Sequence, residues 1–419
     1  MILRIFSILS LCAALNIATA QNLEEYFNGA KKAYSEKKFE AFYTLINKAH
    51  ELHPYHQVIL YQKGIAAALT NHQEESVKSL REAILINADF DLNIPDLLML
   101  SGNKEFAAVK ELQSKLKQSI IQSDTAFIIK DRSLHLESIA ASERKGVFFG
   151  SSIYERKLVR IGKNGETTNF TTPTKNVAAV MGTKLHKRKK EVWICASPLP
   201  EMKNYDSAAR SGVFQLELRT GKILKEFETD SIRDSILGDL IVSKKGEVFV
   251  SDSKSNCVLK VNRERGKLEV FYSNEAFWNI QGITFSDDEA YMFIADYIKG
   301  VFRLDMRTMQ LIYVDRKVLS SLKGIDGLTF YKGSLIAIQN GVKPMRVTQY
   351  FLNKELNAVV DYRIIDRGHP AFNEPTNGCL VGDEFYYVAN SQWSGYDENH
   401  QLLPEDKLQD IVLLKFSLD

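Results

Sequence analysis

"GIDGLTFYKGSLIAIQNG" (residues 324–341) contains two short runs of strand-forming residues separated by the polar dipeptide Lys332-Gly333. Apolar and β-branched runs bounded by Gly, Asn or Asp are typical of strands, and two runs joined by a short polar turn predict a β-hairpin. The pattern recurs along the chain, and inner strands are expected to begin near Glu137, Ala179, Asp239, Gln281, Asp326 and Thr376. This repetition predicts modules of about forty to sixty residues, each with four antiparallel strands.

Six such modules predict an all-β six-bladed propeller over residues 124–419. The last module ends in "IVLLKFSL" (411–418) and lacks a fourth strand, whereas "TAFIIK" (125–130) precedes the first module without a partner. Pairing of these two segments removes an exposed sheet edge and closes the ring.

Residues 21–123 have helical apolar spacing and little glycine or proline. Small and large apolar residues recur thirty-four positions apart: Ala30, Ala33, Ile46 and Ala49 correspond to Gly64, Ala67, Leu80 and Ala83. This spacing resembles the tetratricopeptide repeat. A further helix over 104–120 is expected to cap the stack. The predicted fold is therefore an N-terminal tetratricopeptide-like α-helical domain followed by the propeller.

The first twenty residues are typical of an export signal, with Arg4, an apolar stretch from Ile5 to Ile17, and Ala18-Thr19-Ala20 before Gln21. We expect a mature chain that begins at Gln21 and is periplasmic or secreted. No later segment has the apolar length of a membrane span. The remaining cysteines, Cys195, Cys257 and Cys379, are interpreted as small buried residues with one disulfide at most.

The composition is that of an ordinary soluble globular protein, with 45% hydrophobic and 25% charged residues. A formal charge of +2 gives no reason to expect a nucleic-acid partner. The single dense basic run, "HKRKK" (186–190), is interpreted as a solvated hairpin loop.

Oxygen-bearing side chains stand at the starts of the predicted inner strands, and in a propeller these positions converge at one mouth of the central channel. The expected set is Glu137, Asp239, Gln281, Asp326, Glu374, Thr376 and Asn377. Three carboxylates about 6 Å apart repel by roughly 3 kcal/mol per pair at an effective dielectric of 20. No lysine or arginine occupies these positions, so the acids either take up protons or bind a cation.

Hard oxygen ligands favour Ca²⁺, with Mg²⁺ or Mn²⁺ next, and the predicted metal ligands are Glu137, Asp239, Gln281 and Asp326. An alternative stays open for single residues. Asp326-Gly327 is also an ordinary turn dipeptide, and Asp239 is able to bond local amides where a strand begins.

Residues 125–419 resemble the superfamily of senescence marker protein, gluconolactonase and luciferin-regenerating enzyme, which are six-bladed propellers. The likeness is carried by "ESIAASERKGVFFGSS" (137–152), "GDLIVSKKGEVFVSDS" (238–253), "QGITFSDDEAYMFIADYIKGVFRLD" (281–305), "GIDGLTFYKGSLIAIQNG" (324–341) and "EPTNGCLVGDEFYYVANSQW" (374–393). Catalytic members hold a divalent metal through a glutamate, two asparagines and an aspartate. The resemblance implies that Glu137 is the glutamate and Asp326 the aspartate; Gln281 stands at one asparagine position, and the other has no clear match.

The sequence supports two alternative functions. The first is an exported metal-dependent hydrolase of lactones or related esters, in which Asp326 takes a proton from water, or His135 or His369 does so instead. Glu374, Thr376 and Asn377 are then expected to bind a small lactone or sugar-derived ligand. The second is a non-catalytic binding protein, whose helical repeats and propeller surface hold a protein or glycan.

Overall fold

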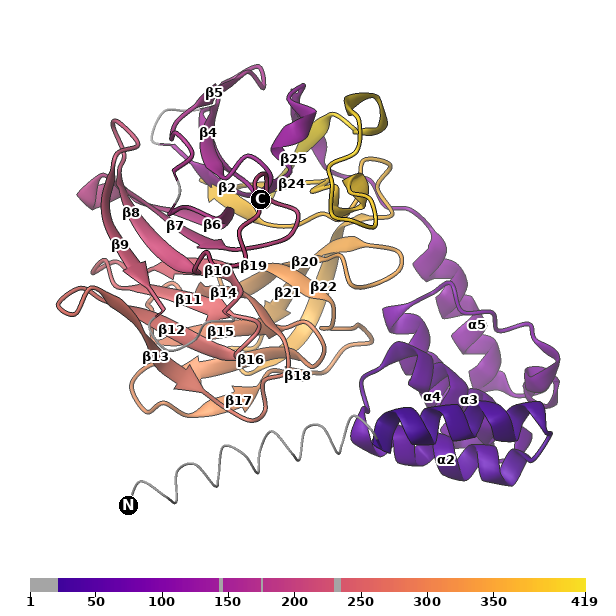
Figure 1. Cartoon of the computed structure of the whole chain (residues 1–419). Coiled ribbons are helices and arrows are strands. Elements are labelled where there is room, and N and C mark those ends of the chain that lie inside the picture. The colour runs from indigo at the N-terminus through magenta and orange to yellow at the C-terminus, as the bar shows by residue number, and fades with distance from the viewer. Residues whose placement is uncertain (1–21, 143–145, 175, 230–234) are drawn as a thin grey trace. The chain divides into compact units, whose positions relative to one another are not determined.

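The computed structural model describes residues 22–142, 146–174, 176–229 and 235–419. The chain divides into two compact units, Met1–Gln118 and Ser119–Asp419 (Figure 1). The division falls slightly before the predicted boundary at residue 123, because residues 120–123 bond to the second unit. The predicted export signal, residues 1–20, lies outside the described residues. In the described part of the chain, every helix is too short or too polar to cross a membrane.

The first unit is helical. Residues 22–35 form its first helix. The others are α2 (Phe39–Leu52), α3 (Gln57–Leu69), α4 (Gln73–Ile86), the 3₁₀ helix η1 (Pro95–Leu100) and α5 (Lys104–Lys117). The residues that recur thirty-four positions apart are all buried.

Helices α3 and α4 pack closely at Gly64. A Cβ atom at this position would lie 2.6 Å from Cγ of Leu80. Buried Ser76 donates a hydrogen bond from Oγ to the carbonyl oxygen of Gly64 at 2.7 Å. The packing agrees with the small and large positions of the sequence repeat, and the assignment to the tetratricopeptide class stays a prediction.

The second unit is β-rich and propeller-like. One four-stranded sheet is β2 (Leu136–Ala141), β3 (Phe148–Ser152), β4 (Lys157–Ile161) and β5 (Thr167–Asn169). A second is β14 (Ile280–Phe285), β15 (Tyr291–Asp296), β16 (Gly300–Asp305) and β17 (Leu311–Tyr313). A five-stranded sheet is β18 (Asp315–Arg316), β22 (Ala358–Arg367), β21 (Arg346–Leu352), β20 (Ser334–Gln339) and β19 (Ile325–Tyr331).

The eight-stranded sheet joins two antiparallel sets of four. The first set is β10 (Leu237–Val242), β11 (Val248–Asp252), β12 (Cys257–Asn262) and β13 (Lys267–Ser273). The second set is β9 (Ile223–Glu228), β8 (Gly212–Glu217), β7 (Glu191–Ser197) and β6 (Ala179–His186). The single pairing of Lys267 with Glu228 connects β13 to β9.

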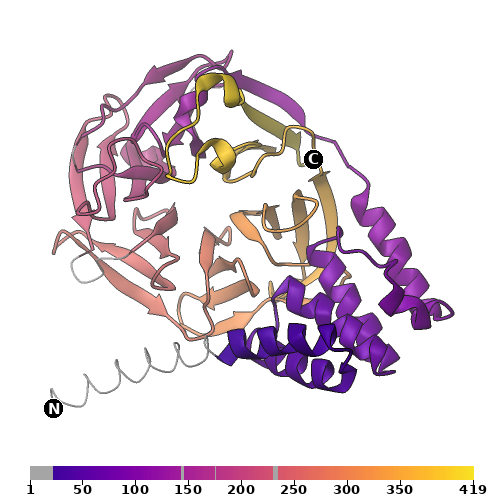
Figure 2. The same ribbon diagram turned by 45° about the vertical axis from the view of Figure 1, so that its right-hand side comes forward.

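The inner strands contact one another in a cycle. Strands β2, β6, β10, β14, β19 and β23 (Gly378–Val381) meet in this order, and β23 contacts β2 again. Figure 2 shows the sheets of this unit following one another around a common centre.

The two ends of the second unit share one sheet. Its order is β1 (Asp124–Ile129), β25 (Ile411–Ser417), β24 (Glu384–Val388) and β23. Strand β1 pairs antiparallel with β25, which confirms the predicted closure. Phe127 and Ile129 of β1 are buried in a cluster with Ile411 and Leu413 of β25. Closure therefore combines backbone pairing with apolar burial.

Candidate active site

The predicted residues stand where the sequence placed them along the strands. Glu137, Gln281 and Asp326 are the second residues of β2, β14 and β19. Asp239 is the third residue of β10, and Thr376 and Asn377 come directly before β23. These strands form the inner cycle described above.

A β-bulge occurs at each of the two acids Glu137 and Asp326. In β2, Leu136 pairs with Ser152 and Ser138 pairs with Ser151 on β3. Glu137 is therefore the additional residue of the bulge. In β19 the register passes from Ile325 opposite Gln339 to Gly327 opposite Ile338, and Asp326 is the additional residue. A bulge turns a side chain away from the regular alternation of a strand.

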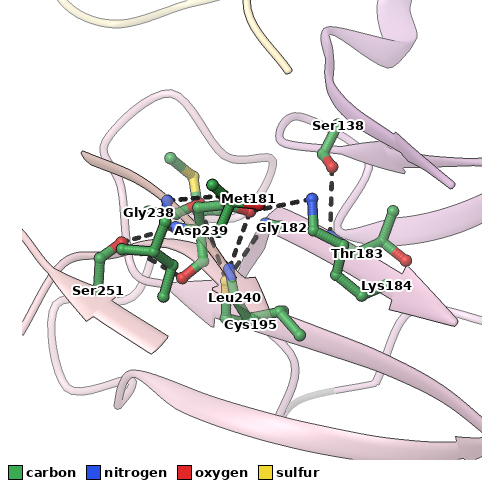
Figure 3. A network of polar contacts seen from close by, with 12 residues as sticks. Ser138, Met181, Gly182, Thr183, Lys184, Cys195, Gly238, Asp239, Leu240 and Ser251 are labelled. Carbon is green, nitrogen blue, oxygen red and sulfur yellow. Dashed lines mark hydrogen bonds and ion pairs between the residues drawn. The ribbon is translucent and has the colours of Figure 1, made fainter. Parts of the chain in front are cut away.

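Strands β6, β10 and β14 also shift register near their starts, whereas β23 pairs regularly with β24. In β2, β6 and β10, a side chain on the adjacent strand bonds an amide at the shift. Ser138 donates its N–H to Oγ of Ser151 at 2.8 Å, and Asp239 donates to Oγ of Ser251 at 3.1 Å. In β6 the N–H of Gly182 donates to Sγ of Cys195 at 3.3 Å (Figure 3).

Thr376 connects Glu137 with Asp326. Its hydroxyl donates to Oε1 of Glu137 at 3.1 Å, and the same side chain lowers the pKa of Asp326. Ser391 donates to the other oxygen, Oε2 of Glu137, at 2.5 Å. We call Glu137, Asp326 and the hydroxyl of Thr376 the paired-acid site.

Neither acid of this site has its ordinary pKa. Burial raises the pKa of Glu137 to about 8, and the nearby charge of Asp326 acts in the same direction. Burial raises the pKa of Asp326 to about 6, although hydrogen bonds from Thr376 and Asn340 favour its charged form. With no cation bound, burial therefore favours the uptake of a proton by this pair of acids.

Two residues that the sequence analysis missed hold Asp326. Asn340 donates from Nδ2 to Oδ2 of Asp326 at 2.8 Å, and Tyr297 donates its hydroxyl to Oδ1 of Asn340 at 3.0 Å. The Tyr297 ring lies against Gly341, where a Cβ atom would be 2.5 Å from Cζ of the ring. The hairpin register gives the missing signal, because Asn340 directly follows Gln339, the partner of Ile325.

Asp239 is engaged elsewhere, which corrects the premise that no cation faces the acids. Its Oδ1 lies 3.4 Å from Nζ of Lys184 and accepts the N–H of Leu240 at 2.9 Å. Its Oδ2 accepts the N–H of Ile283 at 3.3 Å. Asp239 thereby joins β6, β10 and β14, and both of its oxygens already have partners (Figure 3).

The Gln281 side chain also has a partner: its Nε2 donates to Oδ1 of Asn279 at 2.5 Å. Its carbonyl oxygen Oε1 lies over Gly238, where a Cβ atom would be 3.1 Å away. Gln281 is therefore held between β10 and β14 with its amide fixed from one side.

His135 is enclosed behind Glu137. It is 2% exposed, and its Nδ1 lies 2.6 Å from the hydroxyl of Tyr396. Its ring meets Trp393 edge to face at 4.6 Å, and a side-chain hydrogen bond from Trp393 lowers the pKa of Glu137. Burial lowers the pKa of His135 to about 3, so the imidazole is neutral.

The remaining predicted residues surround the same site. The backbone N–H of buried Asn377 donates to the carbonyl oxygen of Glu137 at 3.4 Å. Glu374 has a left-handed backbone, with φ of 60°. Burial raises the pKa of Glu374, and backbone hydrogen bonds from Trp393 and Ser394 oppose that shift.

Carboxylate, hydroxyl and amide oxygens are the donors that Ca²⁺ prefers, and the surroundings of the paired-acid site offer all three. No group of three or more His, Cys, Asp or Glu side chains in the described ranges is arranged to hold a metal ion. A cation at this site would therefore take two carboxylates and neutral oxygens such as the hydroxyl of Thr376.

Comparison with known proteins gives structural neighbours only. No family model matches the chain, and no curated protein matches it. A gluconolactonase from Xanthomonas campestris has 13% identity and a TM-score of 0.49, with 73% of this chain and 92% of that chain covered. Regucalcin, a calcium-binding protein from Agrobacterium tumefaciens, has 14% identity and a TM-score of 0.49, with coverage of 71% and 95%.

A third neighbour is the pyrroloquinoline quinone-bound aldose sugar dehydrogenase from Streptomyces coelicolor, at 11% identity and a TM-score of 0.47, with coverage of 72% and 97%. The neighbours thus include gluconolactonase and other enzymes of differing activity. The functional assignment below rests on the chemistry of the paired-acid site.

Proposed function

We propose that the paired-acid site binds a divalent cation, Ca²⁺ before Mg²⁺ or Mn²⁺, and hydrolyses a small lactone or related ester. One observation carries the proposal: the buried carboxyl groups of Glu137 on β2 and Asp326 on β19 lie close enough for the charge of Asp326 to raise the pKa of Glu137, and Thr376 stands beside them. Burial raises the pKa of both acids, and a bound cation would offset that effect without the uptake of a proton.

In this proposal the residues have separate tasks. Glu137 and Asp326 hold the cation, while Thr376 and Ser391 fix the orientation of Glu137. A bound divalent cation stabilises the negative charge that develops on a carbonyl oxygen under attack by water. Asp326, fixed by Asn340, takes the proton from that water.

His135 is better suited to a supporting task than to that of a base. A base must reach the proton that it removes, and Nε2 of His135 is buried with no hydrogen-bond partner among the described residues. We therefore assign proton transfer to Asp326 and give His135 the role of packing Trp393 beside Glu137.

We further propose that the second unit has six blades, since the two four-stranded sets of the large sheet are joined by a single residue pair. We also propose that the protein is exported and that its helical repeats bind a protein partner. Both points rest on the sequence pattern alone.

The test combines metal binding with turnover. Calcium affinity is measured by calorimetry, and a panel of small lactones is assayed with and without chelator for the wild type, Glu137→Gln and Asp326→Asn. Asp383→Asn is the matched control, because this acid pairs with Lys332 at 2.8 Å on the exposed β23–β24 turn. We expect both site variants to lose calcium binding and turnover, and the control to retain both.

Two other results are informative. Calcium binding with no turnover of any lactone would favour the non-catalytic binding protein. Unchanged calcium affinity in both site variants would overturn the assignment of the metal ligands.

A further inference from the structure

A second cavity, of about 410 Å³, lies between the strand set β2–β5 and the strand set β6–β9. It shares no lining residue with the paired-acid site. Its volume is in the range of about 300–1,000 Å³ that is usual for small-molecule pockets.

The cavity has an apolar floor and a polar rim. Val177, Ile194 and Leu216 line it and are buried, and the half-buried ring of Phe170 stands beside them. Four threonines contribute to the lining, which are Thr171, Thr172, Thr174 and Thr220. An apolar surface with a few convergent polar groups is the usual construction of a ligand pocket.

Among the described residues, the charged members of the lining are two cations, Arg156 and Lys222. Lys222 is exposed. Across the described ranges neither residue forms an ion pair with a carboxylate. Two cations that line one cavity without a carboxylate partner favour an anionic ligand there.

The Arg156 guanidinium is held in place by uncharged acceptors. It donates to the carbonyl oxygens of Thr174 at 2.6 Å, Val177 at 3.0 Å and Lys203 at 3.3 Å. These bonds position the group but leave its charge unneutralised, and they use three of the five N–H donors of a guanidinium. The backbone of Arg156 has φ of 56°, a conformation that non-glycine residues seldom adopt.

We propose that this cavity is a second ligand site, for a small organic anion with an apolar or aromatic body. The carboxylate, sulfate or phosphate group of the ligand bonds to Arg156 and Lys222, and its body covers Phe170 and the apolar floor. The inference is independent of the proposed hydrolase function, since it rests on other residues.

The probe for the test is 1-anilinonaphthalene-8-sulfonate, which has a sulfonate on a fused aromatic body, and its uncharged counterpart is N-phenyl-1-naphthylamine. Fluorescence titrations are made with the wild type, Lys222→Gln and Lys225→Gln. Lys225 is the matched control, because it is an exposed lysine of β9, three positions after Lys222, that does not line the cavity. Circular dichroism establishes that each variant is folded.

We expect one sulfonate probe bound per chain, with affinity lowered about fivefold in Lys222→Gln, as for the loss of one exposed ion pair. Lys225→Gln should bind it as the wild type does, and the uncharged probe should bind both variants equally. Ile223→Trp, which fills the cavity with a larger apolar side chain, should abolish binding of both probes. The proposal is overturned if the sulfonate probe binds Lys222→Gln and Ile223→Trp with the affinity of the wild type.

Discussion

The carboxyl group of Glu137 has two hydroxyl donors, from Thr376 and Ser391, and a second acid nearby. Hydroxyl groups stabilise a carboxylate only in part, because they carry no net charge. Burial and the charge of Asp326 therefore prevail, and Glu137 binds its proton more tightly in the folded chain than in the unfolded one.

This difference predicts a pH dependence of stability. Between its ordinary value of 4.5 and about 8, Glu137 is more protonated in the folded state than in the unfolded state. The free energy of unfolding must therefore fall as pH rises through this window. With chelator present, we expect the melting temperature to drop by several degrees from pH 5 to pH 8, and added Ca²⁺ to raise it more at pH 8 than at pH 5.

Glu137→Gln serves as the comparison for this measurement. The amide cannot ionise, so its melting temperature should vary less over the same window and respond little to Ca²⁺. A wild-type melting temperature that rises steadily from pH 5 to pH 8 without metal would contradict the raised pKa of the site.

Tyr297 is expected to act on Asp326 through Asn340. The Tyr297→Phe variant leaves Oδ1 of Asn340 without its donor, so the amide is free to rotate away from Asp326. We expect a loss of about 1 kcal/mol in the free energy of unfolding and a several-fold weaker calcium affinity, measured by urea denaturation and calorimetry.

Tyr313→Phe is the control, since this exposed tyrosine donates to the carbonyl oxygen of Lys299, away from the paired acids. Gly341→Ala should weaken calcium binding at least as much and cost more stability, because a Cβ atom there meets both the Tyr297 ring at 2.5 Å and Cα of Gly324 at 2.7 Å. Equal calcium affinities in Tyr297→Phe and the wild type would show that Asp326 is held without this chain of bonds.

Sequence alone locates Glu137 and Asp326 because both follow a simple rule, a polar residue at the start of an apolar inner strand. Asn340, Tyr297 and Lys184 follow no such rule. Their contacts depend on which strands lie side by side and on the register of each pair. Local pattern does not contain that information, so these three residues could not be predicted.

At the scale of the strand, the bulges at the starts of β2, β6 and β10 each need a side chain to bond a released N–H group. Ser151, Cys195 and Ser251 do this from equivalent places on β3, β7 and β11. The strands themselves were predictable from their apolar runs, whereas the bulges were not, because an additional residue leaves hardly any trace in the apolar alternation.

The role of Cys195 leads to a prediction about its replacement. Cys195→Ser should have a free energy of unfolding close to that of the wild type, since a hydroxyl group accepts the N–H of Gly182 as the thiol does. Cys195→Ala should lose about 1–2 kcal/mol by leaving that buried N–H without an acceptor. Urea denaturation of the two variants measures the difference.

The same substitution by serine at Cys257 should lower the free energy of unfolding. It is buried in an apolar cluster, and its thiol has no hydrogen bond among the described residues. Cys257→Ser replaces the thiol by a more polar hydroxyl within this cluster, next to Asp252, whose charge helps to raise the pKa of the thiol. The variant should cost about 1 kcal/mol. If Cys195→Ser proved as destabilising as Cys257→Ser, the bonding role of Cys195 would be wrong.

At the scale of the whole chain, the second unit depends on segments from both of its ends. Ser123 and Gln122 donate backbone N–H groups to Oδ1 of Asp366, and the hydroxyl of Tyr387 donates to its Oδ2 at 2.6 Å. Residues 120–129 thus join β22, β24 and β25. The closure was predictable, because two strands without partners stood at opposite ends of the series of β modules. The contacts of Asp366 could not be predicted, since they form only in the folded sheet.

This dependence is tested by two shortened chains. A chain of residues 119–419 keeps β1 and should unfold in one cooperative transition. A chain of residues 130–419 lacks β1, so β25 becomes an exposed edge and the cluster around Ile411 and Leu413 loses Phe127 and Ile129. We expect it to lose several kcal/mol of stability and to associate through that edge.

Thermal melts and size-exclusion chromatography measure both effects, and a synthetic peptide of residues 119–130 should restore the melting temperature of the shorter chain. If residues 130–419 alone melted at the temperature of residues 119–419 and stayed monomeric, the closing strand would not be what holds the ring together.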